Sequence, residues 1–411
     1  MIISKIANKK FAVFLRSEHF LEMLEYYIKR HKRRGPVNPV LSSSEVGVKI
    51  NEWYKMIRQF SVPDAEILKA EVEQEIQRME EDEYLLIYFS LMKFRHQLML
   101  DYLEPVTTRI RPTIEELLEK IETSNKGISG LLSYYSLFFR GMYEFDKKQY
   151  MKAIYYYREA EKQLIHVPDE IERAEFHFKL AEAYYGMKQS HVSMHHVKQA
   201  LDIYNQYELY KVRKVQCMFV ISGNYTDFKH YEKSQPHLEK ALKLSRELNN
   251  KRLISSALYN LGTNFADSGD YEQAEVYIKQ AVEITEKEKL TNLPHSLFSY
   301  AKILFKQGKM NEAIQVSKKG LSAALYQGDE LFAKLQGYLN ALYVDAVDQQ
   351  GVNKTIEYLE KNKNYSYIED IACETAAAYA NSKEFETSYV YHQKMLETQT
   401  QIQRGECLYD F

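Results

Sequence analysis

Residues 251–290 read KRLISSALYNLGTNFADSGDYEQAEVYIKQAVEITEKEKL, and this stretch decides the fold. Small residues occupy three places in it: Gly262, Ala274 and Ala281. Two antiparallel helices approach each other closely only where their side chains are short. The stretch therefore predicts a pair of antiparallel helices.

The same spacing recurs about every forty positions along the chain. The third small residue of each copy falls at Ala160, Ala200, Ala241, Ala281 and Gly320. Seven residues before each of these stand Ala153, Ser193, Ser234, Ala274 and Ala313, and nineteen before stand Gly141, Ala181, Ser222, Gly262 and Ala301. This is the pattern of tetratricopeptide repeats, in which neighbouring helix pairs bury each other's apolar faces.

Two further copies extend the array. A degenerate copy carries Ala376, Tyr379 and Ser388, with Met395 in the last small position, and the stretch Leu331 to Tyr343 supplies the repeat before it. We therefore predict about seven tetratricopeptide repeats over residues 131–411, stacked as a right-handed superhelix. The concave surface of such a superhelix usually binds extended peptides or partner helices.

The composition predicts an all-α protein of the cell interior. Only 15 Gly and 8 Pro occur in 411 residues, which leaves little turn chemistry for a β fold, whereas 34 Tyr and 19 Phe are suited to helix interfaces. A formal charge of -2 argues against attraction of the whole molecule to nucleic acid or to an anionic membrane.

The cysteines and the hydropathy also indicate the cytoplasm. Cys217, Cys373 and Cys407 are odd in number and far apart, so they predict neither a disulfide framework nor a metal site. No apolar stretch approaches the roughly 18 residues that span a membrane, and Phe11 to Leu15 is too short for a signal-peptide core.

Residues 1–42 form a basic extension, with nine Lys or Arg against three Glu. The run from Lys29 to Arg34 is open to two interpretations: an arm that binds nucleic acid, or a solvated, partly helical extension. No stacking aromatic residues adjoin the run, which favours the second interpretation.

Residues 43–105 predict a three-helix bundle. In the first helix one face carries Val46, Ile50, Trp53, Ile57 and Phe60. Pro63 suits the first turn of the second helix, whose apolar stripe is Leu68, Val72, Ile76 and Met79. The third helix, Tyr84 to Tyr102, is apolar nearly all round and is expected at the centre of the bundle. A linker over residues 106–130 contains a connecting helix, Thr113 to Asn125.

Two clusters of polar residues are candidates for a catalytic or a metal-binding site. The acidic run Glu80 to Glu83 stands at the start of the third helix, where carboxylates cap free N–H groups and offset the helix dipole. His191, His195 and His196 include an i, i+4 pair, but no third ligand of suitable type is evident, so we predict no metal site. The sequence has no Gly-rich phosphate loop, no G-x-S-x-G and no H-E-x-x-H, and we expect no cofactor.

Several runs of residues resemble the Rap proteins of bacilli. In the bundle they are residues 46–54 (VGVKINEWY), 79–82 (MEED) and 94–100 (FRHQLML). In the repeats and at the end of the chain they are residues 139–144 (FRGMYE), 174–176 (AEF) and 403–409 (QRGECLY). The resemblance covers residues 46–411, and only the basic extension is foreign to it.

The resemblance implies a cytoplasmic regulator of two-component signalling. Rap proteins bind a response regulator through the bundle and the adjacent repeat surface. Some hydrolyse its aspartyl phosphate in the sporulation phosphorelay, and others block DNA binding by a transcription factor of competence or degradative enzymes. A short Phr peptide occupies the superhelix, inhibits the Rap protein and swings the bundle round to join the repeats.

The resemblance also assigns candidate catalytic residues. Phosphatase members carry a Gln directly after Glu-Glu-Asp at the start of the third helix, where it orients the attacking water. Glu83 takes that place here, after Glu81 and Asp82. An amide can donate a hydrogen bond to water or phosphoryl oxygen, whereas a carboxylate only accepts and adds negative charge. Either Glu83 acts as a general base, or Glu81 and Asp82 hold the water, or the chain binds its partner without rapid hydrolysis.

The peptide-binding residues are predicted on the first helices of the repeats. Counting Ser222 and Gly262 as repeat position 8, Asn224, Asp227 and Asn260 occupy positions 10, 13 and 6. An Asn amide pairs with both an N–H and a C=O of an extended peptide, and Asp227 can take a basic side chain or a terminal amine. Asp267 is a helper one repeat along, and Glu182 faces inward from the second repeat. Polar residues that merely solvate the concave face are the other interpretation.

Two other classes of function remain open. A plain scaffold would hold a protein segment in the superhelix while the bundle has no signalling role. A DNA-binding peptide receptor would require a helix-turn-helix at the amino terminus, and the central helix is too apolar to read a groove of DNA.

Overall fold

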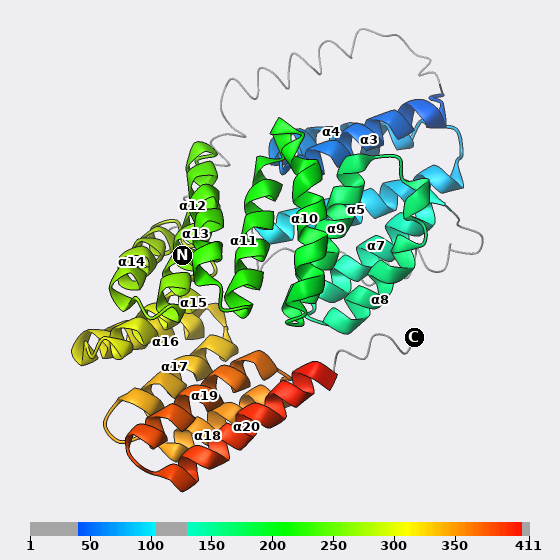
Figure 1. Ribbon diagram of the computed structural model, residues 1–411. Helices are drawn as coiled ribbons and strands as arrows, with labels where there is room; N and C mark the ends of the chain where they lie inside the picture. Colours follow the sequence, from blue (N-terminus) through cyan, green and yellow to red (C-terminus); the bar gives the residue numbers. More distant parts are fainter. Residues whose placement is uncertain (1–39, 104–129, 405–411) are drawn as a thin grey trace.

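The computed structural model describes residues 40–103 and 130–404, and within them the chain forms seventeen α-helices. The basic extension, apart from residues 40–42, and the connecting helix predicted at Thr113 to Asn125 lie outside the described residues. Figure 1 shows a small group of helices from the start of the chain packed beside a long curved stack of helix pairs. The predicted all-α fold class is therefore confirmed.

The three predicted helices of the bundle are present. They are α3 (Ser43–Gln59), α4 (Val62–Ile76) and α5 (Glu83–Leu103). A capping box starts α3, because the Ser42 hydroxyl accepts from the Glu45 N–H while the Glu45 carboxylate accepts from the Ser42 N–H. Pro63 lies in the first turn of α4, where its missing N–H costs nothing.

Seven helix pairs follow in chain order (Figure 1). The first helices of the pairs are α7 (Leu131–Asp146), α9 (Glu170–Gly186), α11 (Lys211–Asp227), α13 (Lys251–Asp267), α15 (Leu293–Lys306), α17 (Glu330–Tyr343) and α19 (Tyr365–Asn381). The second helices are α8 (Tyr150–Glu161), α10 (Ser190–Asn205), α12 (Tyr231–Glu247), α14 (Tyr271–Lys287), α16 (Met310–Gln327), α18 (Gln349–Lys361) and α20 (Phe385–Arg404). Each first helix packs against its own second helix.

The small residues of the repeat pattern lie where the sequence predicts. The alanines at the second and third small positions, among them Ala153, Ala160, Ala274 and Ala281, are fully buried. A Cβ atom on Gly262 would lie 2.4 Å from Ile278 Cγ1 and 3.1 Å from the backbone oxygen of Ala274. The close approach of α13 and α14 therefore requires glycine at this position.

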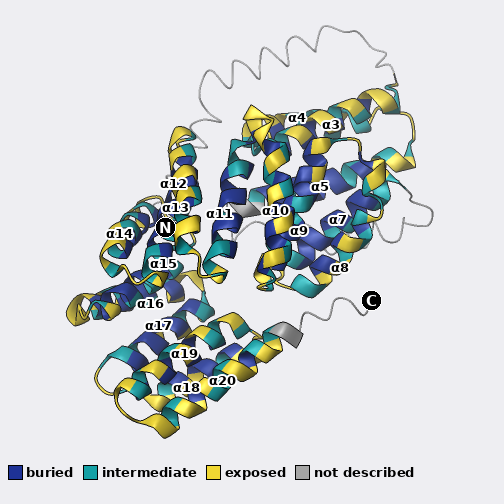
Figure 2. Ribbon diagram, in the orientation of Figure 1, coloured by how far each residue is buried: buried dark blue, intermediate teal, exposed yellow. Residues whose placement is uncertain are grey.

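One hydrophobic cluster joins the bundle to the first repeats. Large buried side chains of α3 and α5 meet those of α7, α8 and α9 in this cluster, including Trp53, Phe94, Phe138, Phe139, Tyr157 and Phe176. Phe94 of α5 stacks on Phe139 of α7 with ring centroids 6.2 Å apart. In Figure 2, α5, α7 and α9 each carry segments in the buried colour. The bundle thus shares its core with the repeats.

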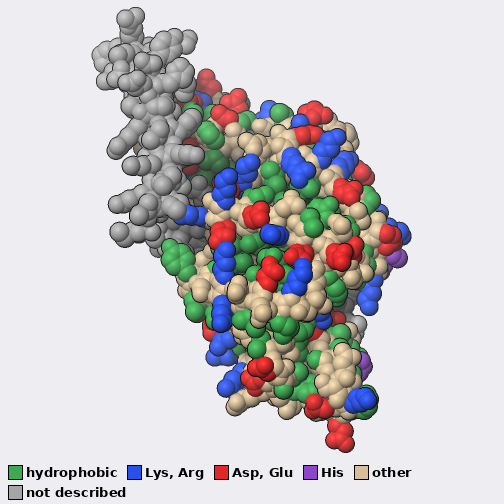
Figure 3. Space-filling view, turned by 90° about the vertical axis from the view of Figure 1, so that its left-hand side faces the viewer, with side chains coloured by type: hydrophobic (Ala, Val, Ile, Leu, Met, Phe, Trp, Pro, Cys, Tyr) green, Lys and Arg blue, Asp and Glu red, His purple; other side chains and the backbone are tan. Residues whose placement is uncertain are grey.

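The far end of the array is different. The last described helix, α20, packs on α19 and exposes Phe385, Tyr389 and Val390, each more than 60% accessible. On the face shown in Figure 3, side chains of both charges are interspersed, in keeping with the formal charge of -2. None of the helices in residues 40–103 and 130–404 combines the length and the hydrophobicity that crossing a bilayer requires.

Substitution of Gly262 by Ala is expected to lower the free energy of unfolding by about 1–3 kcal/mol, because Ile278 and the backbone at Ala274 must move. Gly337→Ala is the matched control, since a Cβ there has nothing within 4 Å and Ala favours the helix by roughly 0.5–1 kcal/mol. Urea denaturation followed by circular dichroism measures both. Equal stability of the two variants would contradict the packing described for α13 and α14.

Candidate functional site

A large cavity lies on the inner side of the superhelix. Its volume is about 860 Å³. Its wall comes mainly from the first helices of the repeats: α9, α11, α13, α15 and α19. We call this cavity the groove. It lies on the concave surface, where the sequence predicts ligand binding.

Aromatic side chains form much of the groove wall. They include Tyr185, Tyr259, Phe298 and Tyr367. The Tyr259 hydroxyl lies 2.7 Å from His295 Nε2 and 2.8 Å from Ser299 Oγ. Burial lowers the pKa of His295 to about 4, so its imidazole is neutral at physiological pH. The wall therefore offers flat apolar surface together with neutral hydrogen-bonding groups, which suits a peptide.

The charged residues of the groove are mostly acidic. Lys302 Nζ lies 2.9 Å from Glu374 Oε1, so these two charges offset each other. Asp267 and Asp370 also line the groove, and neither has an ion pair in the described structure. Burial raises the pKa of Asp267 to about 6, against the opposing effect of Lys302, and Asp370, Glu374 and Asp227 raise it further. A cation in the groove would relieve this concentration of negative charge.

The five predicted peptide-binding residues divide into two sets. Glu182, Asn260 and Asp267 line the groove, and Glu182 also pairs with Lys179 at 2.7 Å. Asn224 and Asp227 are outside the lining. The structure therefore brings three of the five together on one wall.

Asn224 and Asp227 contact the second helix of the preceding repeat. Asn224 is fully buried, and its Nδ2 donates to Ser193 Oγ at 2.9 Å. Asp227 Oδ2 accepts from Ser190 Oγ at 2.5 Å, while the residue as a whole remains exposed. Asn224 therefore holds α11 against α10, and Asp227 keeps one edge open to solvent.

Sequence reasoning missed most of the groove. Tyr185, Tyr259, His295, Lys302 and Asp370 were not predicted. One sequence signal could have identified Lys302. It directly follows the small residue Ala301, just as Glu182 directly follows the small residue Ala181. The position after the small residue thus faces the groove in both repeats.

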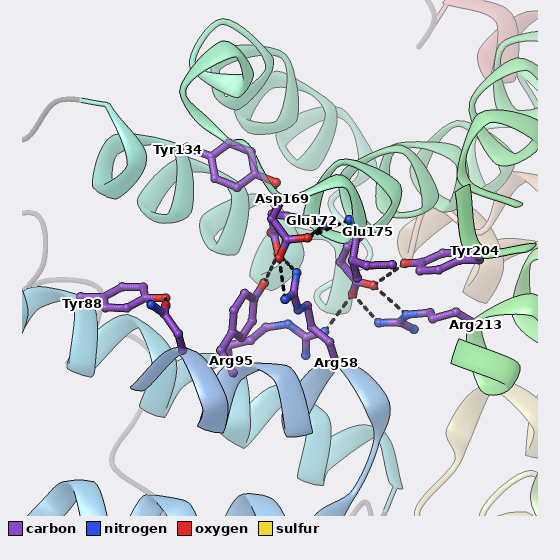
Figure 4. A network of polar contacts seen from close by, with 12 residues as sticks. Arg58, Tyr88, Arg95, Tyr134, Asp169, Glu172, Glu175, Tyr204 and Arg213 are labelled. Carbon is purple, nitrogen blue, oxygen red and sulfur yellow. Dashed lines mark hydrogen bonds and ion pairs between the residues drawn. The ribbon is translucent and has the colours of Figure 1, made fainter. Parts of the chain in front are cut away.

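A buried network of charges joins the bundle to the repeats (Figure 4). On α9, Glu172 Oε2 accepts from the Tyr54 hydroxyl at 2.7 Å and from Arg58 Nη1 at 3.2 Å. The other oxygen of Glu172 accepts from the Tyr134 hydroxyl at 3.1 Å. Arg58 also lies 2.7 Å from Asp169, the residue that caps α9. This half of the network ties the end of α3 to the start of α9.

Glu175, one turn further along α9, is the centre of the other half. It accepts from Arg95 Nη2 at 2.9 Å, from Arg213 Nε at 2.7 Å and from the Tyr204 hydroxyl at 2.9 Å. Burial alone would raise the pKa of Glu175, but Arg213 and Arg95 outweigh it and hold that pKa well below its usual range. Glu175 is therefore ionised and connects α5 and α11 through α9.

The network specifies how the bundle sits on the repeats. Arg58, Arg95, Arg213, Glu172 and Glu175 are each at most 7% exposed. Their formal charges balance once Asp169 is included. Removing one partner of a buried pair strands the other charge, at a cost of roughly 3–5 kcal/mol. If the bundle shifted relative to the repeats, buried charges would lose their partners in the same way.

The predicted catalytic residues lie at the start of α5 and just before it. Asp82 Oδ1 accepts from the Leu85 N–H at 3.0 Å, which confirms that Asp82 caps the helix. Glu81 and Glu83 are exposed. None of the three lines a described cavity. Any chemistry here therefore takes place on an open surface, where a partner must complete the site.

The histidines of α10 are explained by packing. His196 is buried, with its Nδ1 atom 3.1 Å from His177 Nδ1 and the two rings stacked. Burial lowers the pKa of His196 to about 3, so it is neutral. The His191 ring packs against Phe228 with centroids 4.5 Å apart.

The chain is similar to known proteins over most of its length. Residues 40–101 match the family model of the amino-terminal region of response regulator aspartate phosphatase H, and residues 222–287 and 294–325 match tetratricopeptide repeat models. Response regulator aspartate phosphatase H of Bacillus subtilis (strain 168) is 52% identical over 91% of this chain and 100% of its own length.

Solved structures agree. A Rap protein complexed with competence and sporulation factor superposes with a TM-score of 0.82 at 39% identity, over 88% of this chain and 99% of its own. The Rap conjugation gene regulator of the plasmid pLS20, in complex with the Phr* peptide, gives 0.63 at 25% identity, over 89% and 97%.

The bundle packs on the tetratricopeptide superhelix, and the superhelix contains an internal groove. These features define a class of helical repeat proteins. Within this class, the 52% identity over nearly the whole chain is decisive. The chain belongs to the Rap family of response regulator aspartate phosphatases.

Substitution of Glu175 by Gln is expected to lower the free energy of unfolding by about 3–5 kcal/mol, because Arg95 and Arg213 lose their shared counter-charge in a buried site. The control is Glu161→Gln, which removes an ion pair with Arg158 at the surface and should cost about 1 kcal/mol or less. Chemical denaturation of both variants gives the difference. A Glu175→Gln chain as stable as the control would mean that the network does not hold the bundle.

Proposed function

We propose that this chain is a regulator of two-component signalling in the cytoplasm. It binds a response regulator on the amino-terminal bundle and dephosphorylates or sequesters it, and a short peptide in the groove inhibits it. The groove is the observation that supports the peptide most directly. The family membership supports the response regulator.

The groove has the chemistry of a receptor for an extended peptide. A peptide of five or six residues spans about 16–22 Å when extended. It can therefore contact several of the first helices that line the groove. Asn260 can pair with the peptide backbone, and the aromatic wall can take apolar side chains. The unpaired carboxylates Asp267 and Asp370 favour a basic group on the peptide.

The bundle offers a surface for a protein partner beside the acidic run. Leu85 of α5 lies against Gly47 of α3, so these two helices form one face. Val48, Tyr84 and Leu86, the chain neighbours of these two residues, are 61%, 62% and 39% exposed. Exposed apolar side chains next to Glu83 are suited to docking a response regulator with its phosphoryl group near α5.

Glu83 favours sequestration over rapid hydrolysis. Its carboxylate is exposed at the first residue of α5 and cannot donate a hydrogen bond to water or phosphoryl oxygen. A well-placed donor is worth roughly 10² to 10³ in rate. An anti-activator that blocks a DNA-binding response regulator is therefore the second candidate function.

The peptide encoded just downstream of the gene should bind the groove, and Asn260→Ala and Asp227→Ala should each weaken it. Loss of a neutral amide contact costs roughly 1 kcal/mol, and loss of a bond to a charged group roughly 1.5–3 kcal/mol. Asn362→Ala is the control, because that exposed amide bonds only within α18, to the Tyr358 carbonyl. Calorimetry measures the three affinities. Unchanged affinity in both Asn260→Ala, within the groove, and Asp227→Ala, outside its lining, would place the peptide elsewhere.

Substitution of Glu83 by Gln should raise the rate of aspartyl-phosphate hydrolysis about 10² to 10³-fold, with little change in affinity for the phosphorylated response regulator. Glu52→Gln, an exposed change on α3, should leave the rate unaltered. Single-turnover dephosphorylation by wild type, Glu83→Gln and Glu83→Ala measures this. A wild type as fast as the Gln variant, with the Ala variant inactive, would make Glu83 catalytic and overturn the sequestration proposal.

A further inference from the structure

An ion pair connects the second repeat to the seventh. Lys188, in the turn between α9 and α10, places its Nζ 2.7 Å from Oε2 of Glu369 on α19. The two residues are 181 positions apart in the chain. Otherwise α9 and α10 pack mainly on each other and on their neighbours in the array, and α19 packs mainly on α20 and α18. Figure 1 shows the last helices curving back toward the early repeats.

The ion pair is held in position on both sides. The second oxygen of Glu369 accepts from Gln399 Nε2 on α20 at 3.0 Å. Lys188 has a positive φ of 56°, which closes the tight turn after α9. Burial would raise the pKa of Glu369, but its bonds to Lys188 and Gln399 lower it, while the bond to Glu369 raises the pKa of Lys188. Both groups are therefore charged at neutral pH.

The ion pair stands where the two ends of the groove wall meet. Tyr185 and Gly186, just before Lys188, line the groove at one end of the wall. Tyr367 and Asp370, on either side of Glu369 in sequence, line it at the other end. Most of the wall thus runs from α9 through α11, α13 and α15 to α19, and the ion pair joins the turn after α9 to α19.

We propose that Lys188 and Glu369 form a latch that closes the superhelix around the groove and opens when an extended peptide enters or leaves. The proposal rests on the groove being the peptide site. An encircled peptide cannot leave sideways while the latch is closed, so the latch controls the rate of exchange.

The latch is weak enough to open often. The Lys188 and Glu369 side chains are 35% and 21% exposed, and ion pairs of this exposure shift an equilibrium by about fivefold or less. Exposed charges are also screened by salt. Reversal of one charge replaces attraction by repulsion and should favour the open form, whereas exchange of the two residues should restore attraction.

The first test measures closure without any peptide. Spin labels are placed on Lys198→Cys of α10 and Glu386→Cys of α20, both exposed, in a chain with Cys373→Ser and Cys407→Ser. The distance between the labels should lengthen and broaden in Lys188→Glu and return in Lys188→Glu/Glu369→Lys. The control is Lys394→Glu, which breaks an ion pair with Glu360 between α20 and α18 and should leave the distance unchanged. A distance unaffected by Lys188→Glu overturns the latch.

The second test measures exchange of a fluorescent copy of the downstream-encoded peptide by stopped flow. Lys188→Glu should speed both association and dissociation about fivefold, and the exchanged pair should restore the wild-type rates. Rates equal in wild type and Lys188→Glu would refute control of exchange by the latch. If the wild-type chain bound no peptide, both the proposed function and the role of the latch in peptide exchange would be wrong. The spin-label distance would still show whether the Lys188–Glu369 ion pair holds the superhelix closed.

Discussion

The ionised carboxylate of Glu175, buried between two arginines, is the interaction on which the arrangement of the chain depends. It connects α5 of the bundle, through α9, to α11 of the third repeat. Apolar contacts such as Phe94 on Phe139 supply attraction without direction, and several packings of two apolar faces have similar energy. Charges buried at fixed places remove that freedom, because any other placement leaves a guanidinium without its carboxylate. The network thereby fixes the position of the bundle relative to the groove.

Much of the fold could be predicted from the sequence because its causes are local and periodic. The spacing of Gly262, Ala274 and Ala281 identified the helix pairs, and the all-round apolar character of residues 84–102 identified the central helix of the bundle. The network could not be predicted, because Arg58, Arg95 and Arg213 lie 38 to 114 positions from their partners and follow no repeat. Asn224 shows a related difficulty. The same amide can face a ligand or bond a neighbouring helix, and only the position of Ser193 distinguishes the two.

The candidate sites for the two ligands lie in different surroundings. The groove is concave, aromatic and rich in carboxylates, so its ligand is surrounded and desolvated. The start of α5 is open, and the side chains of a docked protein would have to exclude the water there. The shared core and the buried network are the physical connection between them. A change of shape at the groove can therefore reach the start of α5 through the contacts that α7 and α9 make with the bundle.

The shared core has a consequence for the order in which the chain loses structure. Repeat arrays are stabilised by contacts between neighbours, and their ends fray unless something covers them. In this structure the bundle covers the first repeats, as Trp53 and Phe94 are fully buried in the same cluster as Tyr157 and Phe176. Among the described residues, none covers the outer side of α20 in this way, and Phe385 and Tyr389 are exposed. The two ends of the array should therefore differ in stability. Backbone amides of α19 and α20 should exchange with solvent hydrogen before those of α7 and α9. Unfolding should then begin at the carboxyl end of the array and proceed toward the bundle.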